Sequence, residues 1–313
     1  MAHVSSPESL RRKPLGMSPF IAGFELSDIQ LENGIKLRVA IGGHGPPLLL
    51  LHGHPQTHVT WRKVAPDLAK RFTVIAPDLR GYGDSSKPPG DDDHVTYSKR
   101  EMASDFILLM RALNHHHFAV VGHDRGGRVA HRMALDHPNA VSRIAVLDIA
   151  PTATMYAMTN KEFATRYFWW FFLIQPAPLP ERLIAADPEF FLRKHIDGQN
   201  KSADATEPNI FAEYLRCYSD PATRHAICED YRAAASIDLK HDADDAHVRI
   251  SVPLLALWGA RSTVGSLYDV IATWKEKASS VAGRGLDCGH TLQEELPSRT
   301  TEELLGFLLA DQT

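Results

Sequence analysis

The chain has 313 residues, an apolar share of 44 % and a formal net charge of -4 at pH 7. These values are ordinary for a globular protein and fit one large α/β domain, or a core domain that carries an inserted smaller one. Because the charges nearly balance and no long run of one sign appears, nucleic acid is not expected as a partner.

The amino-terminal stretch MAHVSSPESLRRKPLG carries basic side chains but no apolar segment of signal-peptide length. We therefore expect a short disordered tail and a cytoplasmic protein. The longest apolar run, YFWWFFLI at 167–174, is too short to span a membrane and is expected to be buried in the protein. The cysteines, Cys217, Cys228 and Cys288, match no zinc pattern, which favours a reducing compartment.

The first half of the chain alternates apolar strands with helical patterns. Residues 24–43 form an expected hairpin that turns at Asn33-Gly34. The strands PLLLL and RFTVIAP follow, then a helix over about 98–113, the strand FAVVG, a helix in RVAHRMALDHP and the strand RIAVLDIAP. This alternation predicts an α/β fold with a mainly parallel sheet and helices on both faces.

The pattern then changes to aromatic-rich, helix-like segments broken by prolines, as in LIQPAPLPERL. A strand signal returns at ISVPLLALWGA, and a helix, a turn that presents His290 and the final helix TTEELLGFLLA follow. The sequence therefore predicts a core in two parts, residues 1–150 and 245–313, with an inserted helical cap over 151–244.

The most informative motif is GHDRGGR at 122–128, which lies between a strand and a helix. A strand, a glycine-bounded turn with a polar apex and a helix form the nucleophile elbow of the α/β-hydrolase fold. The glycines let neighbouring backbone approach a strained apex residue. Here the apex is Asp124, whose attack on an sp3 carbon gives a hydrolysable ester. A phosphate loop is less favoured, because neither Walker nor Gly-x-Gly-x-x-Gly spacing is met.

A nucleophile of this kind needs a base, and the base needs an orienting acid. His290 lies late in the chain, in the hydrolase order of nucleophile, acid and histidine. Asp148, at the end of a strand, is a better candidate for the acid than Asp269, which falls in a predicted helix; a turn or capping aspartate is the alternative for Asp148. The backbone N–H groups of His54 and Arg125 are candidates for an oxyanion hole.

Arg125 and Arg128 lie one helical turn apart at the start of the helix that follows the elbow. Positive side chains oppose the helix dipole there, so helix stability does not explain them. Two guanidinium groups beside Asp124 can bind a substrate carboxylate through charge-assisted hydrogen bonds and hold its α-carbon over the nucleophile. Surface ion pairing is the alternative.

At these residues the sequence resembles the fluoroacetate (haloacetate) dehalogenases of the α/β-hydrolase superfamily, over about 24–307. The likeness rests on LLLHGHPQTHVTW, PDLRGYGDSSKP, GHDRGGRVAHRMALDHP, QPAPLPE, CEDYRAAASIDLKHD and the GH of CGHT, of which GHDRGGR is the most specific. The resemblance implies these roles: Asp124 as nucleophile, His290 as base, Asp148 as its partner, and Arg125 with Arg128 as the carboxylate clamp.

The resemblance also implies a halide pocket in the cap, built from a His-Trp pair and a tyrosine. Trp170 matches the tryptophan and Tyr231 the tyrosine, but the histidine position holds Trp169. An indole is bulkier than an imidazole and cannot carry its positive charge. Fluoride is strongly hydrated and needs close donors, so C–F cleavage is less expected than cleavage of other carbon–halogen bonds. His54 also stands where family members commonly have phenylalanine.

The expected reaction is hydrolytic dehalogenation of short 2-halo carboxylic acids, haloacetate to glycolate plus halide, through a covalent ester. No cofactor, metal, nucleic-acid or membrane partner is expected, and the family likeness implies a homodimer. Two alternatives stand beside it. One is an epoxide hydrolase, which uses the same Asp-His groups with two tyrosines, and the other is a non-catalytic binding protein on a hydrolase scaffold.

Overall fold

A nine-stranded sheet forms the centre of the protein, described by a computed structural model for residues 11–202 and 204–310. The strand order is β1-β2-β3-β5-β4-β6-β7-β8-β9, antiparallel from β1 to β5 and parallel from β5 to β9. The strands are β1 (Arg11–Met17), β2 (Glu25–Gln30), β3 (Lys36–Gly42), β4 (Pro47–Leu51), β5 (Thr73–Pro77), β6 (Phe118–His123), β7 (Val141–Leu147), β8 (Leu254–Gly259) and β9 (Val281–Leu286). The predicted hairpin is β2 and β3.

Helices cover both faces of this sheet. Apolar side chains form two core clusters, one with α2 and α3 and the other with α1 and α15. Alternate leucines of β4 point into different clusters, which explains why all of its leucines are buried. The helices around the sheet are η1 (His58–Lys63), α1 (Ala65–Leu68), η2 (Val95–Tyr97), α2 (Lys99–Ala112), α3 (Arg125–Asp136), α12 (Thr263–Leu267), α13 (Val270–Lys275), α14 (Leu292–Glu295) and α15 (Pro297–Leu308).

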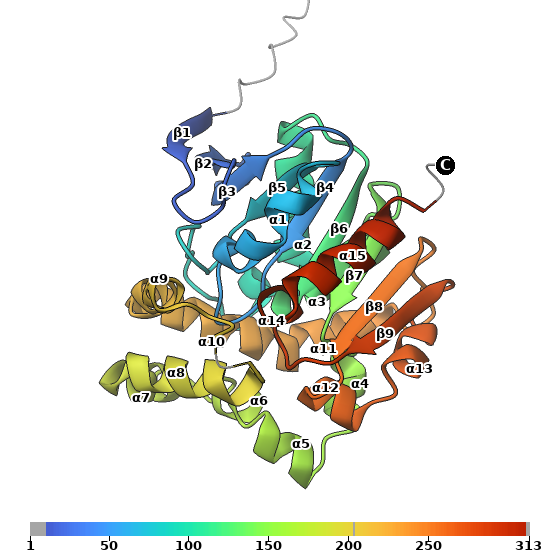
Figure 1. The fold of residues 1–313 in the computed structure, drawn as a ribbon. Helices are drawn as coiled ribbons and strands as arrows, with labels where there is room; N and C mark the ends of the chain where they lie inside the picture. The colour runs from blue at the N-terminus through green and yellow to red at the C-terminus, as the bar shows by residue number, and fades with distance from the viewer. Residues whose placement is uncertain (1–10, 203, 311–313) are drawn as a thin grey trace, which may run out of the picture.

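Between β7 and β8 the chain forms a series of helices that we call the inserted helices. Figure 1 shows most of them as a layer beyond one end of the sheet, in green, yellow and orange. They are α4 (Thr152–Ala157), α5 (Lys161–Arg166), α6 (Trp169–Phe172), α7 (Leu179–Ala186), α8 (Pro188–Gln199), α9 (Pro208–Tyr218), α10 (Pro221–Ala235) and α11 (Ile237–Asp244). The predicted α/β-hydrolase fold with a mainly parallel sheet and an inserted helical layer is confirmed.

Three local expectations need correction. The expected amino-terminal tail, residues 1–16, overlaps β1 (Arg11–Met17), which pairs with β2, while residues 1–10 lie outside the described residues. The segment expected only as a turn before His290 begins with β9, which pairs in parallel with β8. The run 167–174 is only partly buried, since Phe168 is 51 % exposed. Within the described ranges, no helix is both long enough and apolar enough to cross a membrane.

Candidate active site

Asp124 occupies a tight turn between β6 and α3. Its backbone has φ 45° and ψ -115°, a strained conformation for a residue with a side chain. A Cβ on Gly126 would lie 2.4 Å from the backbone carbonyl oxygens of Leu51 and His52, and one on Gly122 would lie 2.4 Å from the Gly126 oxygen. Close backbone packing therefore requires glycine on both sides of the turn.

The carboxylate of Asp124 is nearly sealed from solvent, with 7 % of the residue exposed. Its Oδ2 accepts a hydrogen bond from the backbone N–H of His54 at 3.1 Å. In the described chain no bond joins the backbone N–H of Arg125, the second expected donor, to this carboxylate. Burial raises the pKa of Asp124, but the charges of His290, Arg128 and Arg125 outweigh burial and hold the pKa well below its ordinary value. The side chain is thus an anion at neutral pH.

His290 and Asp148 lie together although 142 residues separate them in the chain. His290 Nδ1 lies 2.6 Å from Asp148 Oδ2, and Oδ1 of Asp148 accepts the Gly259 N–H at 2.9 Å and the Ser262 hydroxyl at 2.7 Å. Burial lowers the pKa of His290, but the hydrogen bond and charge of Asp148 and the charge of Asp124 raise it overall. A histidine held in this way can take up a proton near neutral pH.

Arg125 lies beside this centre but is already paired. Its Nε and Nη2 donate to the two carboxylate oxygens of Asp230 in α10 at 2.8 and 2.9 Å, and both side chains are fully buried. The alternative that Arg125 forms an ion pair on the surface is therefore wrong, because its ion pair with Asp230 is buried. The structure instead joins the core to the inserted helices through a bidentate ion pair.

Arg128 has only neutral partners among the described residues. Its Nη1 donates to the Ala150 carbonyl at 3.1 Å and the Thr152 hydroxyl at 2.9 Å, and its Nη2 lies 3.3 Å from the Met155 sulfur. The guanidinium carbon sits 4.7 Å from the ring centre of Trp170. Burial, and then Arg125, lower the pKa of Arg128, while Asp124 opposes this. A buried cation without a bound carboxylate suits an anionic ligand.

The three aromatic side chains expected around a halide have different neighbours. Tyr231 stacks on the Arg125 guanidinium at 4.2 Å, and its hydroxyl lies 3.4 Å from His54 Nδ1. Trp170 packs beneath Arg128 and against other aromatic rings of the inserted helices. Trp169 contacts His195, with ring centres 4.4 Å apart. The structure thus packs Trp170 and Tyr231 against the arginines and Trp169 against His195.

Sequence reasoning missed two residues of this region, Asp230 and His195. Asp230 precedes Tyr231 in the motif CEDYRA, which was the available signal, whereas His195 belongs to no motif. His195 Nε2 lies 2.6 Å from the Gln199 amide nitrogen, which donates to it and leaves the ring proton on Nδ1. That Nδ1, and Nε2 of the adjacent His54, are buried and have no partner in the described chain. These two nitrogens are therefore polar groups beside the site whose hydrogen-bonding capacity is not used by the protein itself.

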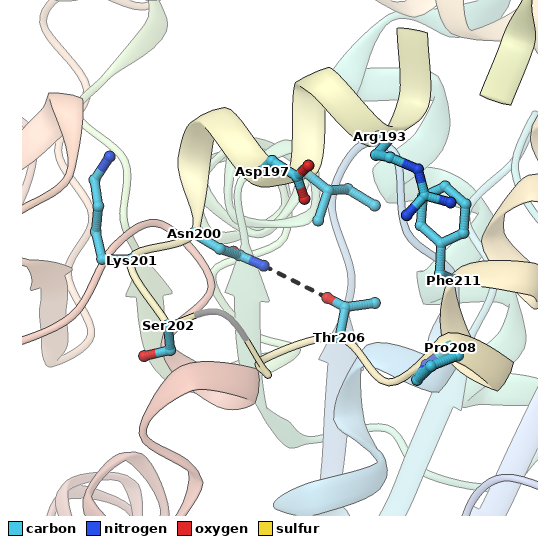
Figure 2. A pocket seen from close by; sticks show the side chains of 9 residues that line it. Arg193, Asp197, Asn200, Lys201, Ser202, Thr206, Pro208 and Phe211 are labelled. Atoms are coloured by element: carbon cyan, nitrogen blue, oxygen red, sulfur yellow. Dashed lines mark hydrogen bonds between the residues drawn. The ribbon is translucent and has the colours of Figure 1, made fainter. Parts of the chain in front are cut away.

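An open pocket of about 680 Å³ lies elsewhere, between α8 and α9 on the inserted helices. Figure 2 shows the Asn200 amide reaching across it toward the Thr206 hydroxyl, 3.5 Å away. It is lined by Arg193, Ile196, Asp197, Asn200, Lys201, Ser202, Thr206, Pro208 and Phe211. None of the predicted site residues belongs to it. Residues 11–202 and 204–310 also contain no group of three or more His, Cys, Asp or Glu side chains placed to hold a metal ion.

Comparison with known proteins places the chain in a family. A family model described as the alpha/beta hydrolase fold matches residues 46–297. The chain is 42 % identical to a fluoroacetate dehalogenase from Burkholderia sp., over 91 % of this chain and 94 % of that protein. It is 34 % identical to a soluble epoxide hydrolase from Corynebacterium sp. (strain C12), over 88 % and 94 %. A Salmonella enterica protein of known structure is 64 % identical, with a TM-score of 0.94, over 95 % and 98 %.

Proposed function

The chain belongs to the fluoroacetate (haloacetate) dehalogenase family of the α/β-hydrolases, and we propose that it hydrolyses short 2-halo carboxylic acids, converting a haloacetate to glycolate and halide. One observation carries the proposal. The ionised carboxylate Asp124 is one helical turn before Arg128, whose buried guanidinium has no carboxylate partner in the described chain. A substrate anion bound by Arg128 brings its α-carbon to the nucleophile.

The first step is a displacement at carbon. A carboxylate oxygen of Asp124 forms a bond to the α-carbon while the carbon–halogen bond breaks and the halide leaves with the electron pair. The product is an ester between Asp124 and the substrate. The N–H of His54, which already donates to Asp124 Oδ2, is placed to hold an oxygen of this group.

The second step hydrolyses the ester. His290 accepts a proton from water as the water oxygen attacks the carboxyl carbon of Asp124, and Asp148 stabilises the imidazolium. The bond from that carbon to the substrate oxygen then breaks, and His290 returns the proton to the departing 2-hydroxy acid. Asp124 is left as a carboxylic acid with one oxygen from water, and because its pKa is held low it releases the second water proton to solvent and returns to the carboxylate.

The leaving halide departs on the side of the carbon opposite Asp124. We propose that Trp170 and Tyr231 contact it, with Trp169 at the pocket edge. The unpaired nitrogens of His54 and His195 lie in the same region and add polar groups to it. Burial lowers the pKa of His54 to about 3 and that of His195 well below its ordinary value, so both rings are neutral. A site whose polar groups are neutral favours a weakly hydrated halide over fluoride.

Epoxide opening is the second candidate function, because the chain is also similar to an epoxide hydrolase over most of its length. The same Asp124, His290 and Asp148 would serve, with tyrosine hydroxyls as donors to the epoxide oxygen. The buried charge of Arg128 favours the acid substrate over a neutral epoxide. A non-catalytic binding role is disfavoured by the assembled His290–Asp148 pair beside an ionised Asp124.

Halide release tests the proposal. Wild-type protein and Asp124→Asn are incubated with fluoroacetate, chloroacetate and 2-chloropropionate, and released halide is measured. Wild type is expected to release chloride and Asp124→Asn none. Asp269→Asn is the matched control, because Asp269 is exposed and only caps α13. No release from any haloacid, together with diol formation from an epoxide, would reject the dehalogenase function.

Isotope labelling tests the covalent route separately. Wild type is allowed several turnovers of chloroacetate in heavy-oxygen water, and the peptide that contains Asp124 is analysed by mass spectrometry. The label is expected in the Asp124 carboxylate, because water attacks its carbon in the second step. Label found only in glycolate after a single turnover would instead indicate direct attack of water on the substrate.

We also propose a homodimer, the assembly that the family resemblance implies. Leu183 in α7 and Phe190 in α8 are 57 % and 61 % exposed, and exposed large apolar side chains favour a protein interface. Light scattering is expected to give the mass of a dimer for wild type and of a monomer for the double variant Leu183→Glu, Phe190→Glu. A dimer that persists in the double variant would exclude this surface.

A further inference from the structure

One carboxylate of the inserted helices, Asp230 in α10, collects hydrogen bonds from three separate parts of the core. Oδ2 accepts from Arg125 Nε at 2.8 Å and from the Tyr82 hydroxyl at 2.7 Å. Oδ1 accepts from Arg125 Nη2 at 2.9 Å and from the Lys99 ammonium. Burial raises the pKa of Asp230, but Arg125 and Lys99 outweigh burial and lower it, so the carboxylate stays charged. Asp230 has no capacity left for another strong partner.

Asp230 also determines how the Arg125 guanidinium faces the site. Arg125 Nη2 makes a further bond to the backbone oxygen of Asp230 at 2.8 Å, so Asp230 occupies Nε and Nη2. The Tyr231 ring, 4.2 Å below the guanidinium carbon, fixes the plane of the group. The remaining nitrogen, Nη1, is buried and has no partner in the described chain. A guanidinium held in this way presents the two N–H groups of Nη1 as donors in a fixed direction.

The two arginines therefore differ in charge balance. The positive charge of Arg125 is matched by Asp230 at hydrogen-bond distance. Arg128, also buried, donates only to neutral oxygens and a sulfur within residues 11–202 and 204–310. A bound anion consequently gains most of its net attraction from Arg128, whereas Arg125 contributes directed hydrogen bonds.

We propose that Asp230 is a positioning residue for the substrate carboxylate, acting through Arg125 to orient the bound acid while Arg128 supplies the charge that binds it. This inference rests on the proposed haloacid hydrolysis and assigns unequal parts to the two arginines. Orientation of the carboxylate sets the line between the α-carbon and Asp124, on which the rate of displacement depends. Asp230 touches neither the substrate nor the reacting atoms.

The test separates orientation from affinity with Asp230→Asn, which keeps the shape of the side chain but removes its charge. We expect kcat for chloroacetate to fall about 10- to 100-fold, because Arg125 is no longer held on one edge. The inhibition constant of acetate is expected to stay within about threefold of wild type. Arg128 is intact in this variant, and the positive charge of Arg125 is no longer neutralised by Asp230. Arg128→Gln is expected to weaken acetate binding about 30-fold or more.

Two further variants keep the test decisive. Tyr82→Phe removes one donor to Asp230 without changing the charge. It is expected to lower kcat by less than Asp230→Asn does and to leave the acetate affinity unchanged, and it can be tested even if Asp230→Asn folds poorly. Asp238→Asn is the matched control, because Asp238 also pairs with Lys99 but does not contact Arg125. Wild-type kcat in Asp230→Asn would overturn the inference. Parallel loss of kcat, acetate affinity and urea resistance would do so as well, since it would indicate a structural role alone.

Failure of the proposed function gives a different result. If wild type releases no halide from chloroacetate, haloacid hydrolysis is rejected. Acetate binding, followed by calorimetry, then still tests the unequal roles, because Asp230→Asn should bind acetate like wild type and Arg128→Gln should not. An equal loss of acetate binding in both variants would overturn the inference whatever the reaction is.

Discussion

The carboxylate of Asp148 determines which ring nitrogen of His290 carries the proton. Asp148 Oδ2 accepts from His290 Nδ1 at 2.6 Å and so leaves Nε2 free to take a proton from water. In Asp148→Asn, the Gly259 N–H and Ser262 hydroxyl, which now donate to Oδ1, will keep the amide oxygen on their side. The amide nitrogen then faces His290 and donates to Nδ1. The ring proton moves to Nε2, which can no longer accept one.

Only the second step depends on this proton. Loss of the correct tautomer and of the buried charge should slow ester hydrolysis about 10³- to 10⁴-fold, equivalent to about 4 to 5.5 kcal/mol in the barrier. Attack by Asp124 on the substrate carbon needs no base, so it should continue. Rapid-quench measurement with chloroacetate should then give a burst of chloride equal to the enzyme concentration and almost no further release. Intact mass should increase by one carboxymethyl group.

Two variants serve as controls for this experiment. Ser262→Ala removes one donor to Asp148 but keeps the carboxylate, so a fall of only about 2- to 10-fold is expected. Asp124→Asn should give neither the burst nor the mass increase. Turnover of Asp148→Asn within about tenfold of wild type, with no accumulated adduct, would refute this role of Asp148.

Three other predictions concern pH, the elbow and the pocket. The neutral form of His290 is the base and its pKa is raised above 6.5, so kcat should fall as the pH drops through that raised value. The value of kcat/KM should persist to lower pH, because it depends on the first step and the pKa of Asp124 is held below 3.8. If kcat and kcat/KM fell at the same acid pH, the assignment of His290 to the second step alone would be contradicted. Gly126→Ala places a Cβ 2.4 Å from two carbonyl oxygens at the end of β4, so urea unfolding should reveal a loss of about 1–3 kcal/mol. Gly306→Ala, in open space on α15, should be neutral or stabilising by up to about 1 kcal/mol. Trp169→His should raise fluoride release relative to chloride release; an unchanged ratio would count against the pocket proposal.

The elbow could be predicted from the sequence because its causes are local. Glycine spacing around Asp124 reflects backbone contacts made within one turn and with the neighbouring strand end. The edge strands lacked such a signal. Arg11–Met17 has no apolar alternation, and Val281–Leu286 contains two glycines, so both strands depend on backbone pairing with a neighbour.

The ion pair between Arg125 and Asp230 could not be predicted in the same way. Its partners lie 105 residues apart, on a core helix and an inserted helix, and no periodicity relates them. The sequence placed Arg125 near the nucleophile and predicted a free clamp, because it gave no means of knowing that a carboxylate would be buried against it. Whether Arg125 has a buried carboxylate partner depends on how α10 packs against the core, and that packing depends on the whole fold.

The burial of this ion pair has a kinetic consequence. Asp124 and Arg125 are buried beneath the inserted helices, and Asp230 of α10 is buried against them, so we expect a substrate to enter and a product to leave when part of this layer moves. Separating Arg125 from Asp230 would expose two charges to a dry interior, which is costly. We therefore expect α10 to remain attached to the core while other inserted helices open. The rate of that opening would then set an upper limit on kcat, and an added viscogen, which slows the opening, should lower kcat.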